Sequence, residues 1–411
     1  MVISASNKIY RINTSDLLLS FILLFPIADI LTGFMIFRLG MPEAFLGSPS
    51  QIVRLVFLFV GLSQIPTRDF NKCCKLIIYF LIIESISFFY INNITPFISG
   101  INYSFKIIYI YIFYLWTDYC CRHSKSFYKK FVKIIIVSAV LYAFLGIIMP
   151  VALGISKASY SEGTFGQKGL LASGNALGIY MGIITALYTL KKNKSIFEKI
   201  INLILFSALI LLATKTALLF AGLILLVNLK NYNKYFGITL VGLFVIFLIC
   251  LWETIYDSIS VIADVIIYRY ENSESFFSFI MSSRDNYISD AFNEFFRSSI
   301  WPLKLIIGGG AFMSFRPDYY NGMVFDTLEN EFFDIFFMYG LIGLTIYLGI
   351  IFYELYRIYK VSSVLSFLFL LFALHSIFAG HILFDGIPIM AGLLIIIMSK
   401  YPKQAKLSFN I

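Results

Sequence analysis

The most constraining feature of the sequence is a series of apolar runs, each close to the length that crosses a lipid bilayer. A helix needs about 20 apolar residues to span the hydrocarbon core. Runs of this kind occupy residues 16–37, 50–63, 75–92, 101–117, 134–151, 170–190, 199–213, 216–229, 235–252, 331–353, 361–379 and 385–400. Only 13% of the residues are charged, against roughly 25% in a soluble domain. The sequence therefore predicts an all-α integral membrane protein with about twelve transmembrane helices.

The basic residues predict an orientation for these helices. Most of the 32 Lys and Arg residues fall at the two ends of the chain and in every second connection. Because cytoplasmic connections are enriched in Lys and Arg, both termini are expected in the cytoplasm of a bacterium, with the helices in its inner (plasma) membrane. The formal charge of +9 is then explained by topology, and no nucleic-acid partner is expected.

Several charged residues are not explained by topology, because they lie within spans or in outer connections. The basic ones are Arg38, Arg54, Lys106, Lys157, Lys168, Lys215, Arg269, Arg284, Arg297, Lys304 and Arg316. Charges inside a membrane are costly and mark functional sites by default. Asp29, Arg54, Glu84 and Lys106 are expected to pair with one another inside the bundle, in a combination that the sequence leaves open.

The chain divides into three parts. Residues 1–252 hold the first nine spans, residues 253–330 form a large outer (periplasmic) loop, and residues 331–411 hold the last three spans and a cytoplasmic tail. Loops this long without a spanning run are usually functional. From Ser283 to Arg297 the apolar positions follow a helical period, so an amphipathic helix is expected there, lying against the membrane surface.

The outer loop contains two candidate anion-binding features. Arg284 opens the amphipathic helix, and its guanidinium could hold a diphosphate in a bidentate manner or be a solvated surface cation. Residues 308–310 are three glycines, so the Gly309 amide could contribute to an anion cradle, although a plain turn is the commoner use of such a run. Lys215, between two apolar runs, is a second phosphate candidate or a lysine that reaches toward the membrane surface.

Two further positions have both a functional and a structural interpretation. Glu329 could act as a general base at the lipid–water boundary, but its spacing from Asp326 favours a capping box at the start of the next helix. Asn175 lies in Ser173-Gly174-Asn175-Ala176-Leu177-Gly178, where small residues predict close helix packing. His375, His381 and Asp385 do not match a metal motif, and no nucleotide or other cofactor motif is present in a suitable context.

Three local patterns resemble the O-antigen polymerase (Wzy) family and the related O-antigen ligases. The first runs from Gly163-Thr164-Phe165 to the glycine and asparagine-rich segment 174–178, and the second runs from Ser282-Ser283-Arg284 to the three glycines. The third is Glu329-Asn330 followed by Gly340-Leu341-Ile342-Gly343. Ligases often show histidine at the position of Glu329, so this departure favours a polymerase. Many members carry arginine where Lys215 stands.

This resemblance implies a glycosyl transfer that uses no nucleotide sugar and no cofactor. The donor would be a glycan on undecaprenyl diphosphate, and the acceptor a sugar hydroxyl on a second lipid-linked oligosaccharide repeat unit. Arg284 and Glu329 would carry the chemistry. The residues expected to bind the diphosphate or the glycan are Lys215, Arg297, Arg316, Lys168, Asn175, Asn330 and Gly309. Membrane lipid would surround the chain, and a chain-length regulator protein is an open partner.

Two alternative functions remain open at this point. One is an O-antigen ligase, which differs in its acceptor. The other is a flippase or transporter of lipid-linked oligosaccharides. Transporters of this kind tend to show internal repeats and broken helices, and no repeat relates the two halves of this sequence.

Overall fold

The computed structural model describes residues 13–42, 47–91, 94–159, 166–191, 194–231, 284–313, 327–380 and 382–409. In these ranges the chain is helical except for one short strand pair and its connections. The first half comprises α1 (Thr14–Leu39), α2 (Pro49–Gln64), α3 (Thr67–Ile91), α4 (Ile94–His123), α5 (Lys125–Leu141), the π-helix η1 (Tyr142–Ile148), α6 (Met149–Ala152), α7 (Gly174–Leu190), α8 (Ile196–Leu212) and α9 (Lys215–Asn231). The second half comprises α13 (Arg284–Arg297), α14 (Trp301–Ile307), α15 (Gly310–Met313), α16 (Glu331–Tyr359), α17 (Ser363–Ala379), α18 (Ile389–Lys400) and α19 (Pro402–Phe409).

The helices coincide with the apolar runs. Helix occupies most of each predicted run within the described ranges, but residues 170–173 and 385–388, at the starts of two runs, are not helical. Run 235–252 lies outside the described ranges. Three helical stretches are long and apolar enough to cross a membrane: Thr14–Leu39, Ser126–Ala152 and Glu331–Tyr359. Shorter apolar helices include α7, α17 and α18. The structure thus supports a multi-pass all-α membrane protein, while the total of twelve spans and the outer placement of the 253–330 loop stay predictions.

Side-chain caps determine where several helices begin. The side chains of Ser48, Ser173 and Asn330 accept a hydrogen bond from a backbone amide in the first turn of α2, α7 and α16. Ser195 and Glu198 form a reciprocal capping box on α8. These contacts satisfy amides that have no partner within the helix, so short polar residues between apolar runs become the boundaries of the helices.

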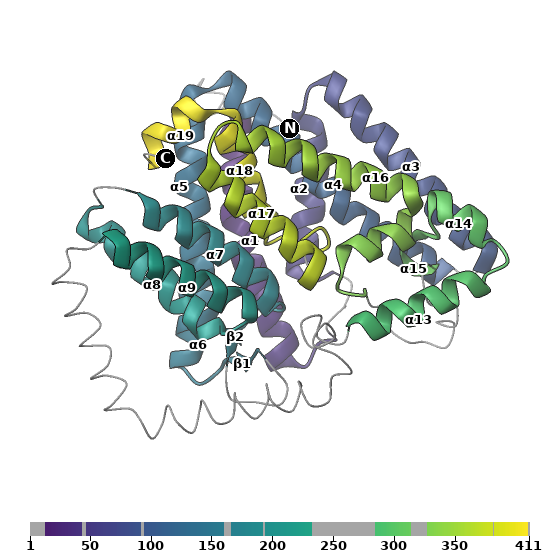
Figure 1. The fold of residues 1–411 in the computed structure, drawn as a ribbon, viewed down its shortest axis with the longest axis horizontal. Helices are drawn as coiled ribbons and strands as arrows, with labels where there is room; N and C mark the ends of the chain where they lie inside the picture. The colour runs from purple at the N-terminus through teal and green to yellow at the C-terminus, as the bar shows by residue number, and fades with distance from the viewer. Residues whose placement is uncertain are drawn as a thin grey trace, which may run out of the picture.

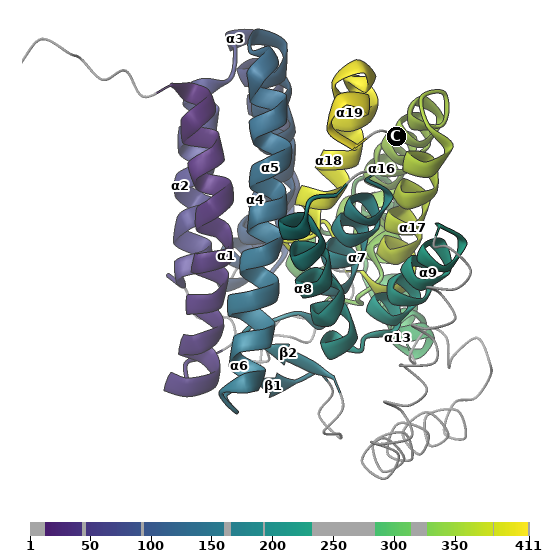
Figure 2. The same ribbon diagram turned by 90° about the vertical axis from the view of Figure 1, so that its left-hand side faces the viewer.

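The two ends of the bundle differ in composition. Figure 2 shows α1, α2, α4 and α5 upright, with α19 near one end and α6, β1 and β2 at the other. We call the first end the basic end, because the starts of α1 and α5 and the ends of α4 and α18 meet there through ion pairs of Lys130, Arg122 and Lys400. We call the opposite end the hairpin end. Figure 1 shows the whole bundle from another side, and in Figure 2 helices α7, α8, α9, α17 and α18 lie beside this upright group.

The hairpin end is closed by a backbone segment that turns back into the bundle. Strand β1 (Lys157–Ala158) pairs antiparallel with β2 (Gln167–Gly169). The Leu170 amide then donates to the Gly146 carbonyl of η1 at 2.9 Å. A Cβ atom at Gly169 would clash with the Gly146 carbonyl, and one at Gly33 of α1 would clash with the Leu170 carbonyl. Glycine is therefore required at both contacts, and residues 170–173 lie between the helices.

The amphipathic helix of the outer loop is confirmed, but its apolar face is covered by protein. Ile288, Ala291 and Phe295 of α13 are buried. Phe292 packs edge to face against Phe337 of α16, with ring centroids 5.0 Å apart. The start of α16 offers an aromatic surface that buries these side chains, and the expected position of the helix against the membrane surface stays a prediction.

Candidate functional site

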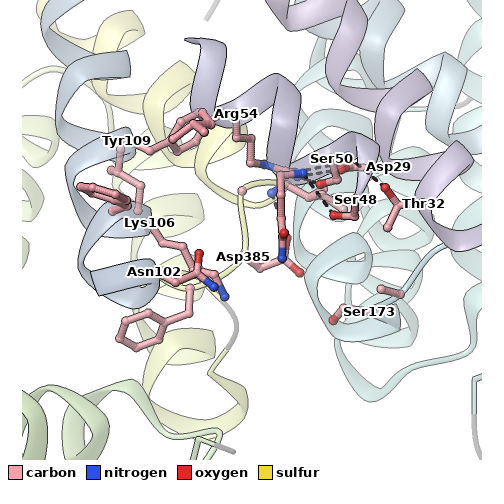
Figure 3. Close-up of a pocket in the computed structure, with 18 of the residues that line it drawn as sticks. Asp29, Thr32, Ser48, Ser50, Arg54, Asn102, Lys106, Tyr109, Ser173 and Asp385 are labelled. Atoms are coloured by element: carbon pink, nitrogen blue, oxygen red, sulfur yellow. Dashed lines mark hydrogen bonds and ion pairs between the residues drawn. The ribbon is translucent and has the colours of Figure 1, made fainter. Parts of the chain in front are cut away.

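A polar cavity of about 300 Å³ extends from the middle of α1 toward the hairpin end. Its walls come from α1, α2 and α4, from the 171–173 segment and from the loop between α17 and α18. The lining includes two acids, two cations and six uncharged polar side chains: Asp29, Asp385, Arg54, Lys106, Thr32, Ser48, Ser50, Gln51, Asn102 and Ser173. Figure 3 labels all of these groups except Gln51 and shows them converging from separate elements. Polar groups that converge in a mostly apolar protein are the usual sign of a binding site.

Arg54 and Asp29 form a bidentate ion pair on one wall. The two terminal nitrogens of Arg54 lie 2.8 and 2.9 Å from the two carboxylate oxygens of Asp29. The Tyr142 hydroxyl, from η1, donates to the same carboxylate at 2.5 Å. The Arg54 side chain is 21% exposed and that of Asp29 is 8% exposed. The sequence left open which of the charges in the spans pair, and the structure pairs Arg54 with Asp29. With Tyr142, this one aspartate joins α1, α2 and η1.

Arg54 is held tightly by its other neighbours. One of its terminal nitrogens also donates to Ser50, one turn earlier in α2. Its guanidinium carbon lies 5.9 Å from the centre of the Phe25 ring. A Cβ at Gly386 would clash with its Nε atom. The guanidinium is therefore fixed between α1, α2 and the 382–388 loop, and Gly386 is required for the close approach.

Lys106 differs from Arg54, because it forms no ion pair in the part of the chain that the structure describes. Its ammonium group lies 4.4 Å from the centre of the Tyr103 ring, one turn earlier in α4. The charged groups that act on it electrostatically are Asp385 and Arg54. Lys106 thus places a positive charge in the cavity wall without a carboxylate bound to it.

The loop that carries Asp385 into the cavity is held by a buried glutamate. Glu331, in the first turn of α16, accepts hydrogen bonds from Ser376 and from the amides of Ile382 and Leu383. Phe384 packs edge to face on Tyr103 of α4, with ring centroids 5.3 Å apart. The position of Asp385 is therefore determined by α16, α17 and α4 together.

Lys168, one of the predicted binding residues, contacts a residue that lines the cavity. Its ammonium group donates to the carbonyl of Ala172, a lining residue, at 2.8 Å. Asn175 is half-buried in the first turn of α7. Small residues around Asn175 allow close packing, because Cβ atoms at Gly174 and Gly178 would lie against Thr214. The packing interpretation of this segment is confirmed, and a binding role for Asn175 and Lys168 stays a prediction.

Lys215 begins α9, directly after the two-residue turn that follows α8. Ala213 is in the left-handed region and is the C-cap of α8. Lys215 is exposed, and its neighbour Thr216 lies 3.0 Å from Nδ1 of His375 in α17. His381 lies outside the described residues.

Glu329 and Asn330 precede α16. The helix begins at Glu331 with Asn330 as its N-cap, so the proposed capping box with Glu329 at the third helical position is wrong. Glu329 instead adopts a positive φ of 55°. Its backbone packs against Gly380 at the end of α17, where a Cβ would lie 2.7 Å from the Glu329 carbonyl carbon. A non-glycine residue in this region is strained, which is a feature that clusters at functional sites.

The three glycines connect the outer loop to the bundle. The Gly309 amide donates to the Phe337 carbonyl at 3.1 Å, and the Ala311 amide donates to the Glu84 carboxylate at 3.0 Å. Glu84 is fully buried in α3. It is therefore used to anchor α15, rather than to pair with Lys106 or Arg54.

The basic candidates of the outer loop are only partly described. Arg284 is the first residue of α13, and Arg316 lies outside the described residues. Arg297 is 72% exposed at the other end of α13 and pairs with Glu294 at 2.5 Å. Lys304 in α14 is buried, and this burial lowers its pKa to about 8.

From the sequence, Asp29, Arg54 and Lys106 are recognisable as charges in spans, and Asp385 lies near two histidines. That these four residues share one cavity is visible only in the structure. The useful signal was the presence of charge inside apolar helices. No spacing in the sequence indicates that η1, α2 and the 382–388 loop meet at Asp29.

The helices and the cavity define a multi-pass α-helical membrane protein with a charged internal site. The O-antigen ligase like membrane protein family matches residues 12–229, which is more than half of the chain. The chain belongs to this family. The match includes Asp29, Arg54 and Lys106 and the first of the three resembling patterns; the patterns around Arg284 and Glu329 lie beyond it. No curated protein matches the chain significantly.

Proposed function

We propose that the protein polymerises lipid-linked oligosaccharide repeat units into a surface polysaccharide of the O-antigen type. The observation that carries this proposal is the charged cavity inside a bundle of the O-antigen ligase-like family. A transfer between two lipid-linked sugars needs apolar walls for the lipid tails and a polar recess for the sugars. Apolar helices that surround a recess containing Arg54, Lys106 and Asp385 meet this need.

In the proposed reaction an acceptor sugar hydroxyl attacks the anomeric carbon of the donor glycan. The new glycosidic bond forms as the bond between that carbon and the diphosphate oxygen breaks. Undecaprenyl diphosphate leaves with the electron pair, and the hydroxyl proton passes to a base. We assign the base to Glu329 and the diphosphate contacts to Arg284 and Lys215, because cations stabilise the charge that develops on the leaving group. The ion pair of Arg297 with Glu294 makes Arg297 a weaker diphosphate candidate.

The proposed orientation puts the basic end in the cytoplasm and the hairpin end at the outer leaflet of the inner membrane. Arg122, Lys130 and Lys400 meet at the basic end, as the positive-inside rule requires of a cytoplasmic face. The cavity and Lys215 then lie toward the side on which lipid-linked repeat units would be polymerised. Both termini are cytoplasmic in this arrangement.

An O-antigen ligase is the second candidate, and the family description favours it. A ligase would transfer the finished glycan to a different acceptor and would use the same donor. Ligases often have a histidine at the position of Glu329, so the glutamate here favours the polymerase. The third alternative, a flippase, would move the lipid-linked unit without making a bond.

Deletion of the gene in its native host separates these functions, with the surface polysaccharide resolved on a gel. A polymerase deletion leaves single repeat units on the acceptor lipid and removes the ladder. A ligase deletion removes all attached repeats while lipid-linked polymer accumulates. Trapping of single units on the inner leaflet would indicate a flippase, and an unchanged ladder would contradict all three.

A further inference from the structure

Among the residues that the structure describes, the charges that line the cavity balance, and this bears on the kind of ligand that the cavity suits. Two cations, Arg54 and Lys106, face two acids, Asp29 and Asp385. The rest of the polar lining is hydroxyl or amide groups, and Phe105, Tyr109 and Phe384 add aromatic surface. A recess with no excess of positive charge does not favour a diphosphate over water. A recess lined with neutral hydrogen-bond donors, neutral acceptors and aromatic rings fits a polyhydroxylated ligand.

Arg54 is not available to a phosphate. Sites for phosphate use guanidinium groups whose paired N–H donors face the ligand. Both terminal nitrogens of Arg54 are already bound to Asp29, and one of them also to Ser50. A diphosphate in the cavity would also meet the carboxylates of Asp29 and Asp385, which would repel it.

Lys106 and Asp385 line the cavity from different elements, α4 and the 382–388 loop. Both line the cavity, and Asp385 acts electrostatically on Lys106, but no direct ion pair joins these two described residues. A sugar hydroxyl can accept from an ammonium group and donate to a carboxylate at the same time. Asn102 lies one turn before Lys106 on α4 and adds an amide donor and acceptor beside this position.

We propose that this cavity binds one sugar unit of the substrate, and that Lys106 and Asp385 hold a hydroxyl of that sugar between them. The diphosphate is bound elsewhere, at the loop cations. The inference rests on the proposed function for the origin of the sugar. It adds that the N-terminal helices α1, α2 and α4 recognise the glycan, and that substitutions at the cavity change glycan binding rather than lipid diphosphate binding.

The test uses the purified full-length protein in detergent and two probes. The first is the repeat-unit oligosaccharide, released by mild acid from the lipid-linked pool of the host and observed by saturation-transfer NMR. The second is inorganic pyrophosphate, observed by ³¹P NMR. Three variants are compared with the wild type: Lys106→Met, Asp385→Asn and Lys130→Met. Lys130 is an exposed residue paired with Asp16 at the basic end, so its variant is the matched control. Lys106 has no ion-pair partner within the described ranges, so its replacement by an apolar side chain of similar length should not impair folding, which gel filtration checks.

The inference predicts that the oligosaccharide binds the wild type and the Lys130→Met protein equally. Lys106→Met and Asp385→Asn should each weaken this binding about tenfold, the usual size of a lost hydrogen bond to a charged group. Pyrophosphate binding should not change in any variant. Pyrophosphate binding that depends on Lys106, or oligosaccharide binding that survives both substitutions unchanged, would overturn the inference. Loss of the proposed function is separate, since it is detected in the polysaccharide ladder of the deletion strain and not in these binding measurements.

Discussion

The cavity and the basic end each contain a buried aspartate that binds a tyrosine and a cation. They differ in whether a second cation is also bound to an acid. At the basic end Asp118 is 3% exposed and receives Arg122, Lys400 at 2.7 Å and the Tyr401 hydroxyl at 2.9 Å. In the cavity Asp29 receives Arg54 and Tyr142. Arg122 and Lys400 thus share Asp118, whereas the second cation of the cavity, Lys106, is bound to neither acid within the described ranges.

This difference separates a structural cluster from a functional one. Asp118 joins the end of α4 to the end of α18, and its arginine is 59% exposed, so water screens the pair. Asp29 joins α1, α2 and η1 inside the bundle, where each contact is shielded. The same three residue types therefore fix helix ends in one place and shape a binding cavity in the other.

The largest expected effect is from breaking the cavity pair. Arg54→Leu should destabilise the protein by about 3–5 kcal/mol, because it leaves the Asp29 carboxylate buried without a cation. Thermal unfolding in detergent measures this. The double variant Asp29→Asn with Arg54→Leu should recover much of the loss, and a double variant no more stable than Arg54→Leu would show that the pair itself is not responsible.

Tyr142→Phe should cause the next largest loss of stability, about 1.5–3 kcal/mol, because it removes a hydrogen bond to a charged acceptor. Tyr128→Phe is the matched control: Tyr128 is also fully buried in the same helical column, and its hydroxyl has no hydrogen-bond partner within the described ranges. Unfolding by denaturant should therefore show a loss for Tyr142→Phe and almost none for Tyr128→Phe. Equal losses of stability in the two variants would show that the hydrogen bond from Tyr142 to Asp29 does not stabilise the protein.

Gly386→Ala should cost about 1–3 kcal/mol through overpacking against the Arg54 guanidinium. It should also shorten the polysaccharide made in cells, because it moves the loop that carries Asp385. Gly349→Ala in α16 meets no neighbour within 4 Å and should leave both stability and polymer length unchanged or slightly improved. If Gly386→Ala changed neither stability nor polymer length, the loop would approach Arg54 less closely than the structure shows.

The smallest effect is expected at the basic end. Arg122→Gln should cost less than about 1 kcal/mol, since its partner Asp118 keeps Lys400 and Tyr401. The same unfolding assay used for Arg54→Leu measures it. A loss as large as that of Arg54→Leu would erase the distinction between the two clusters.

The sequence predicts the helices well and the cavity poorly, for a physical reason. Hydropathy acts along the chain, so runs such as 16–37 and 331–353 identify α1 and α16. The interactions that build the site join residues far apart: Tyr142 bonds Asp29 across 113 positions, and Ala311 bonds Glu84 across 227. Such pairings depend on how helices pack, which no local pattern records. The same limit applies to Gly340, whose positive φ of 65° breaks α16 in the middle of an apolar run.

Local rules also misassigned the start of α16. The spacing of Asp326 and Glu329 fits a capping box, but Asn330 caps the helix and the carboxylate of Asp334 accepts from the amides of Leu328 and Asn330. Two capping solutions compete within a few residues, and packing of Glu329 against Gly380 accompanies the one observed. Sequence spacing could not distinguish them.

The most direct test of the central claim is the polysaccharide ladder of the deletion strain that carries Lys106→Met, beside strains that carry wild type and Lys130→Met. Membrane abundance is measured in the same cells. We predict that Lys106→Met reaches wild-type abundance but does not restore the long polymer, whereas Lys130→Met restores it. A normal ladder from Lys106→Met would contradict the claim that the cavity serves glycan transfer.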